Sequence, residues 1–120
     1  MRRDLNLIRA IVLAVEDQES KGSGEGITIE GYTREQIGYH CYLIVDAGLA
    51  KGVDVTSIID TLPNYLITHL TSAGHDFADT ARSDSTWSKA TTIVKTQGGG
   101  VSLDVLKQVL VSIIKSALGL

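Results

Sequence analysis

Hydrophobic residues recur at helical spacing near the start of the chain, over residues 4–18. A stripe at three- and four-residue intervals indicates an amphipathic helix, and its members are Leu5, Leu7, Ile8, Ile11, Val12 and Val15. Asp4 stands before this stripe as a candidate N-cap. A polar segment with three glycines follows, up to residue 26, and predicts a flexible loop. Residues 27–30 (ITIE) then alternate apolar and polar side chains, which predicts a short, half-buried strand.

The next helix is predicted over residues 34–48, and its start is well specified. Thr33 as N-cap and Gln36 at the third helical position match a capping box, and Tyr32 with Ile37 matches a hydrophobic staple. Gly48 supplies a residue able to adopt the left-handed conformation that ends many helices. The expected apolar face consists of Ile37, Cys41, Ile44 and Val45.

The pattern changes after residue 50. Residues 51–60 and 65–71 are rich in β-branched side chains and flank Pro63 and Asn64, which are typical turn residues. We therefore expect a β-hairpin with its turn at residues 61–64.

Three further helices are predicted in the C-terminal part. The first is capped by Thr71 or Ser72, and the second is capped near Asp84, with Trp87, Ala90 and Val94 facing inward. Residues 96–100 (TQGGG) close the second helix.

The last helix has Ser102 as N-cap and Val101 with Leu106 as a staple. Its apolar stripe is broad and comprises Leu103, Leu106, Val109, Leu110, Ile113, Ile114 and Ala117. Two interpretations remain open: the helix completes a monomer core, or it also packs against a second copy and forms a homodimer.

The composition is that of an ordinary globular protein, with 43% hydrophobic and 21% charged residues in 120. This length fits one domain with a single core. Cys41 is the lone cysteine and cannot form an internal disulfide, which favours a reducing compartment. Because no signal peptide or membrane-spanning run is evident, we expect a cytoplasmic protein.

The charge balance disfavours nucleic acid. The net charge is -3, whereas a nucleic-acid binder usually carries a basic footprint. In the helix at 34–48, Arg34 is offset by Glu35 and Asp46, and in the hairpin Lys51 is offset by two aspartates.

Two tyrosines give a competing interpretation. Tyr39 and Tyr42 lie three residues apart on the polar side of the helix at 34–48, and aromatic residues are favoured at protein interfaces. The alternative is that the C-terminal helices cover this side and bury both tyrosines.

The residues do not form a recognisable catalytic or metal site. His40, His69, His75 and Cys41 lack the paired spacing of a zinc site. His75 and Asp79 share a helical face, which indicates a surface ion pair, and Cys41 is expected in the core. We therefore expect no metal, no cofactor and no enzymatic activity.

The order of helix, short strand, helix, hairpin and further helices resembles a winged helix. Two segments carry this likeness: YHCYLIVDAGLAKG resembles the end of a recognition helix, and LTSAGHDF resembles the segment after the wing. Over nearly its whole length the chain resembles the domain of unknown function 2513 family of uncharacterised bacterial and phage-associated proteins. The matching segments are MRRDLNLIRAI, IGYHCYLIVDAGL, LTSAGHDFADTARSDSTWSKA and GGVSLDVLKQVL.

The resemblance implies an α+β, winged-helix-like fold. It places a core at residues 1–71 and a C-terminal helical extension at residues 72–120 of a single domain. The chain departs from a DNA-binding helix-turn-helix because residues 29–33 leave no room for the helix that braces the recognition helix.

We therefore expect a non-enzymatic binding module, a phage or prophage accessory protein that acts through protein-protein interaction. The alternative is a DNA-binding transcriptional regulator of winged-helix type. The expected binding face, for protein or DNA, comprises Arg34, Glu35, Tyr39, Tyr42, Asp46 and Lys51.

Overall fold

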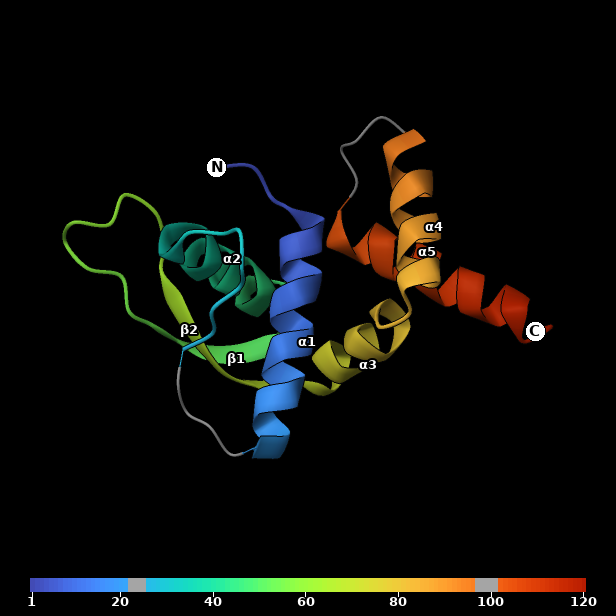
Figure 1. Cartoon of the computed structure of the whole chain (residues 1–120), viewed down its shortest axis with the longest axis horizontal. Helices are drawn as coiled ribbons and strands as arrows, with labels where there is room; N and C mark the ends of the chain where they lie inside the picture. Colours follow the sequence, from blue (N-terminus) through green and yellow to red (C-terminus); the bar gives the residue numbers. More distant parts are fainter. Residues whose placement is uncertain (22–25, 97–101) are drawn as a thin grey trace. The chain divides into compact units, whose positions relative to one another are not determined.

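The computed structural model describes residues 1–21, 26–96 and 102–120. Within them, five helices and a two-stranded antiparallel sheet form a mixed α+β structure (Figure 1), which is the predicted fold class. The chain divides into two compact units, Met1–His75 and Asp76–Leu120. The helix α3 (Ser72–Ala81) contains the boundary between them.

The first helix, α1 (Leu5–Lys21), begins where the sequence predicts and continues three residues beyond residue 18. The side chain of Asp4 caps it, because its Oδ1 accepts the N–H of Leu7 at 3.1 Å. The predicted stripe is buried at Leu7, Ile8, Ile11, Val12 and Val15. This face of α1 packs against the second helix and the second strand of the same unit.

The predicted strand at residues 27–30 is wrong. The segment pairs with no strand among the described residues, and the N–H of Tyr32 bonds the carbonyl of Ile29 at 3.3 Å to form a turn. Ile27 and Ile29 are half-buried and Thr28 and Glu30 are exposed, so the alternation reflects one side covered by the fold. Half-buried and exposed side chains therefore alternate here although the segment lacks the ladder of hydrogen bonds that defines a strand.

The second helix, α2 (Arg34–Asp46), starts with the predicted capping box. The N–H of Gln36 donates to Thr33 Oγ1 at 3.1 Å, and the N–H of Thr33 donates to Gln36 Oε1 at 2.8 Å. The helix ends two residues before the predicted position. Gly48 has a φ of 80°, and the N–H groups of Gly48 and Leu49 bond the carbonyls of Val45 and Ile44, a Schellman motif.

The hairpin follows directly. Strand β1 (Ala50–Asp54) pairs with β2 (Tyr65–Leu70), with Ala50 opposite Leu70 and Asp54 opposite Tyr65. Thr68 is the extra residue of a bulge, since Lys51 pairs with His69 and Gly52 pairs with Ile67. Both strands pack against α2.

The hairpin exists as predicted, but its first strand is shorter than residues 51–60 and its turn is longer than residues 61–64. After Asp54 the chain forms a loop, residues 55–64, in which the side chains of Thr56 and Asp60 bond the loop's own backbone. Such local bonds offer the backbone an alternative to the sheet ladder.

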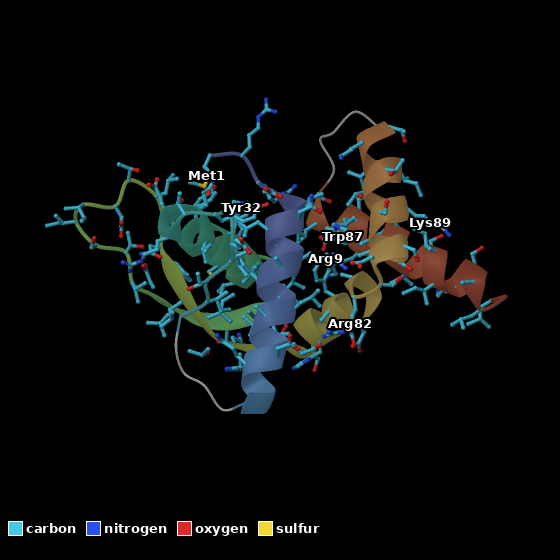
Figure 2. The ribbon with its side chains drawn as sticks, viewed as in Figure 1. Met1, Arg9, Tyr32, Arg82, Trp87 and Lys89 are labelled. Carbon is cyan, nitrogen blue, oxygen red and sulfur yellow. The ribbon has the colours of Figure 1, made fainter. Side chains whose placement is uncertain are left out.

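The second unit contains the end of α3 together with α4 (Asp84–Thr96) and α5 (Leu103–Ala117). Ser83 caps α4, one residue before the predicted Asp84, because its Oγ accepts the N–H of Thr86 at 3.3 Å. The predicted inward residues of α4 are buried, and the ring of Trp87 meets that of Phe77 edge-on at 6.2 Å. Figure 2 labels Trp87 on α4.

Helices α4 and α5 pack against each other. Ser102 caps α5 as predicted, with its side chain accepting the N–H of Val105. Of the predicted stripe, Leu103, Leu106 and Leu110 are buried, Val109, Ile113 and Ile114 are half-buried, and Ala117 is exposed. The predicted staple of Val101 with Leu106 and the TQGGG segment fall partly or wholly outside the described residues.

Candidate binding face

The exposed side of α2 carries four of the six predicted site residues. Glu35, Tyr39, Tyr42 and Asp46 follow one another at intervals of four, three and four residues, so they lie on one helical face. The opposite face holds the buried residues of α2, including Ile37, His40, Cys41 and Ile44. We call the four residues the α2 stripe.

The two tyrosines in the middle of the α2 stripe belong to an aromatic cluster. The ring centroids of Tyr39 and Tyr42 lie 5.9 Å apart, and Tyr42 meets the ring of Tyr65 from β2 at 5.3 Å. All three side chains are half-buried. The cluster therefore offers ring surface to solvent while its members hold one another in place. Sequence reasoning missed Tyr65 as part of this face because only the hairpin brings it to α2.

The two ends of the α2 stripe are acidic. Glu35 lies in the first turn of α2 and Asp46 in the last, and both are exposed. An α-helix that enters a nucleic-acid groove would have to place these carboxylates near phosphates. Exposed ring surface between two carboxylates is better suited to a partner without negative charge.

The two predicted basic residues lie outside the α2 stripe. Arg34 is exposed at the start of α2 and faces the loop, where its charge contributes to lowering the pKa of Asp60. Lys51 is exposed on β1 opposite His69. From residue 52 to residue 81 the chain has no lysine or arginine, so the hairpin beyond Lys51 offers no cation for a phosphate.

The loop between the strands extends away from α2 and the sheet (Figure 1). We call residues 55–64 the hairpin loop. Its base is closed by the N–H of Val55 on the carbonyl of Asn64 at 2.8 Å and by the N–H of Asn64 on Thr56 Oγ1 at 2.9 Å. The N–H of Thr56 also donates to Asp54 Oδ1 at 2.9 Å.

The tip of the hairpin loop is a turn from Ser57 to Asp60. Asp60 Oδ2 accepts the N–H of Ser57 at 2.8 Å, and the N–H of Asp60 bonds the carbonyl of Ser57 at 3.1 Å. The two central residues of this turn are Ile58 and Ile59, which are almost fully exposed. These two residues were not predicted as part of the binding face, because their β-branched side chains favour a strand.

Hydrogen bonds lower the pKa values of two aspartates at the hairpin loop. Bonds from the side chain and backbone of Thr56 hold the pKa of Asp54 below its ordinary value. The backbone bond from Ser57 is the main cause of the lowered pKa of Asp60. Asp54, at the end of β1, and Asp60, in the loop, are therefore deprotonated down to a lower pH than an ordinary aspartate.

A glycine lets the hairpin loop approach α2. A Cβ atom on Gly38 would collide with the side chain of Asn64, which is the last residue of the loop. Between the start of α2 and the loop lies an open hollow of about 590 Å³, lined by residues that include Arg34, Glu35, Ile59 and Pro63. The close approach at Gly38 places the last residue of the hairpin loop against α2.

His40 and Tyr32 join the start of α1 to α2. His40 Nε2 accepts the N–H of Asp4 at 2.9 Å, and Tyr32 donates its hydroxyl to Asp4 Oδ2 at 2.9 Å. Figure 2 labels Tyr32 near the N-terminal end of α1. His40 is 1% exposed, so these groups hold the two helices together and do not belong to the binding face.

The remaining candidate residues have structural roles. Cys41 is buried as predicted, and this burial raises the pKa of its thiol to about 11. His75 Nδ1 lies 2.9 Å from Glu16 Oε2, so the structure pairs it with α1. Among residues 1–21, 26–96 and 102–120, no group of histidine, cysteine and carboxylate side chains could hold a metal ion. No helix in the described part of the chain is both long and apolar enough to cross a bilayer.

The chain is similar to one protein family and to one curated protein. The family described as "Hypothetical protein (DUF2513)" matches residues 2–100. An uncharacterised protein of Haemophilus influenzae is 36% identical over 121 residues, covering 98% of this chain and 99% of the relative. No solved structure matches the chain significantly.

Proposed function

The chain belongs to the DUF2513 family of hypothetical proteins, and we propose that it acts by binding another protein rather than by catalysis. The contact face is the α2 stripe together with the neighbouring hairpin. The observation that carries this proposal is the aromatic cluster of Tyr39, Tyr42 and Tyr65, placed between the exposed carboxylates of Glu35 and Asp46.

The chemistry of this face is that of a protein contact. Tyrosine supplies a large, rigid surface and a hydrogen-bonding hydroxyl, and it is enriched among residues that dominate binding energy. The mutual contacts of the rings restrict their motion, so less side-chain entropy is lost when a partner covers them.

We also propose that the first unit is a variant of the winged helix. In this interpretation α2 occupies the position of the recognition helix, and β1 with β2 forms the wing. Within the described residues 26–33 that precede α2 there is no helix, whereas a DNA-binding motif of this type uses such a helix to cross the backbone. The proposed setting is the cytoplasm, as a phage or prophage accessory factor that acts on a host component.

DNA binding is the second candidate, favoured by the winged-helix order of α2 and the hairpin. In it, the exposed Arg34 and Lys51 would contact phosphates. Binding to random-sequence duplex DNA, followed by fluorescence anisotropy, would then weaken steeply with salt and with loss of either residue. The acidic ends of the α2 stripe favour the protein partner over this alternative.

Site-specific photo-crosslinking in the producing cell tests the two candidates together. A benzophenone amino acid replaces Asp46, at the exposed end of the α2 stripe, and a matched control replaces Lys89, which is exposed on α4. We expect a discrete adduct from position 46 that protease removes and nuclease does not. Replacing Tyr39 and Tyr42 by alanine should abolish it.

A nuclease-sensitive adduct at position 46 would instead support DNA binding. No adduct at position 46, or the same adducts from positions 46 and 89, would contradict a contact through the α2 stripe.

A further inference from the structure

The tip of the hairpin loop has an unusual composition for a turn. Central turn positions favour Gly, Pro, Asn, Asp and Ser, which suit turn geometry or bond the backbone. Here they hold Ile58 and Ile59, whose side chains are almost completely exposed. Two adjacent isoleucines in this position contribute almost no burial to the fold, so packing does not account for them.

The loop holds these two side chains in a defined place. The turn is closed by Asp60 bonding Ser57, and the loop base is closed by Thr56 bonding Asn64. The contact between Asn64 and Gly38 anchors the same base on α2. A preorganised loop loses little conformational freedom when its tip is buried by a partner.

The charges near the tip favour one class of binding partner over others. Asp54 and Asp60 flank the two isoleucines in sequence, and aspartate carboxylates are negative near neutral pH. A second copy meeting tip to tip would bring like charges together, and anionic lipid headgroups or nucleic-acid phosphates would also be repelled. A partner with positive charge beside an apolar surface matches both features.

We propose that the hairpin loop inserts Ile58 and Ile59 into an apolar pocket of a partner protein, and that lysine or arginine residues on the pocket rim face Asp54 and Asp60. This inference deepens the proposed protein-binding function and rests on it. The isoleucines supply the buried, central contact, where most binding energy resides. The carboxylates at the rim guide the encounter and its orientation.

The test places the benzophenone amino acid at Thr61, which is exposed beside the tip and leaves both isoleucines intact. We expect a protein adduct whose cross-linked segment, identified by mass spectrometry, contains apolar residues next to lysine or arginine. The adduct yield should fall about tenfold or more in the variant Ile58→Ser with Ile59→Ser. Because both side chains are exposed, this variant should fold normally, which circular dichroism checks.

Matched variants separate the apolar contact from the charges. Val111→Ser removes an exposed apolar side chain from α5 and should leave the yield unchanged. Asp54→Asn with Asp60→Asn keeps an acceptor oxygen at each position but removes the charges, and it should lower the yield about threefold or more and reduce its sensitivity to salt.

Each other outcome overturns the inference. These outcomes are an adduct with a second copy, with lipid or with nucleic acid, a cross-linked segment without basic residues, no adduct, or a yield unaffected by the serine variant. If position 46 gives a protein adduct while position 61 fails in one of these ways, the proposed function stands and the tip contact is wrong. If neither position gives a protein adduct, both are wrong.

Discussion

His40 accepts the backbone N–H of Asp4 through its Nε2 atom at 2.9 Å, across 36 positions of sequence. Its other ring nitrogen, Nδ1, lies 2.7 Å from the carbonyl oxygen of Gln36. A carbonyl can only accept and an N–H can only donate. The ring therefore donates from Nδ1 and accepts at Nε2, which requires the neutral form with its proton on Nδ1.

Replacing this histidine should destabilise the first unit. His40→Ala leaves the N–H of Asp4 without its partner and opens space beside α1, so we expect a loss of about 1–3 kcal/mol in the free energy of unfolding. Urea denaturation measures it. The control His69→Ala, at an exposed strand position, should change the free energy by less than about 0.5 kcal/mol. Equal effects of the two variants would contradict the role of His40.

Gly38→Ala should also destabilise the protein, although alanine is the better helix former by about 1 kcal/mol. The added methyl group collides with the side chain of Asn64 and forces the hairpin loop to move, at a cost of about 1–3 kcal/mol. A double-mutant cycle with Asn64→Ala checks the cause, because removing that side chain should relieve most of the effect. A Gly38→Ala protein that is more stable than the wild type would show that the contact is absent.

The hairpin loop should lose its order in acid. The pKa values of Asp54 and Asp60 are lowered in the folded state, so their contribution is present above the unfolded-state pKa and is lost as the pH falls through the folded-state values. An NMR titration from about pH 7 to about pH 2 should show the amide signals of Thr56 and Ser57 changing below the ordinary aspartate pKa. Transitions at or above that ordinary value would contradict the hydrogen bonds described here.

Cys41 should resist alkylation in the folded protein. Its thiol is buried, and this burial raises its pKa to about 11, so very little reactive thiolate is present at about pH 8. Iodoacetamide labelling followed by mass spectrometry should show almost no reaction until urea unfolds the chain. Rapid labelling without urea would place Cys41 outside the core.

Helix α5 leads to a prediction about self-association. Val105 and Val111 are exposed on opposite sides of the buried stripe of α5, and Val105 also lines an open apolar hollow of about 410 Å³ with Ile93 of α4. We expect sedimentation equilibrium to give the mass of a dimer for the wild type and of a monomer for Val105→Asp, because a buried, unpaired carboxylate is costly. A monomeric wild type would favour the alternative in which α5 only completes the core.

Local signals predicted the helices well. The capping box of Thr33 and Gln36 and the helix end at Gly48 involve only residues a few positions apart. Both ends of α2 can therefore be predicted from the local sequence. The buried positions of α1 and α4 follow from helical periodicity for the same reason. The α2 stripe could be predicted as one side of a single helix.

The remaining features depend on residues that are distant in sequence or on competing local bonds. Tyr65 joins the aromatic cluster only because β2 lies beside α2. Residues 55–60 contain β-branched residues typical of a strand, but Asp54 and Asp60 bond the backbone and form a loop instead. The alternation in residues 27–30 correctly indicated which side chains are covered, but it could not reveal that no described strand forms a hydrogen-bonded ladder with them.

The bonds that hold the hairpin loop come from Asp54, Thr56, Ser57, Asp60 and Asn64, and none comes from the side chains at positions 58 and 59. The residues that hold the loop in shape are thus different from the two residues, Ile58 and Ile59, that the loop exposes. Two codons could be rewritten to present other side chains from the same support, by mutation in nature or by library selection in the laboratory. The hairpin loop is in this sense a ready-made grafting site, at which recognition could be changed without redesigning the protein that carries it.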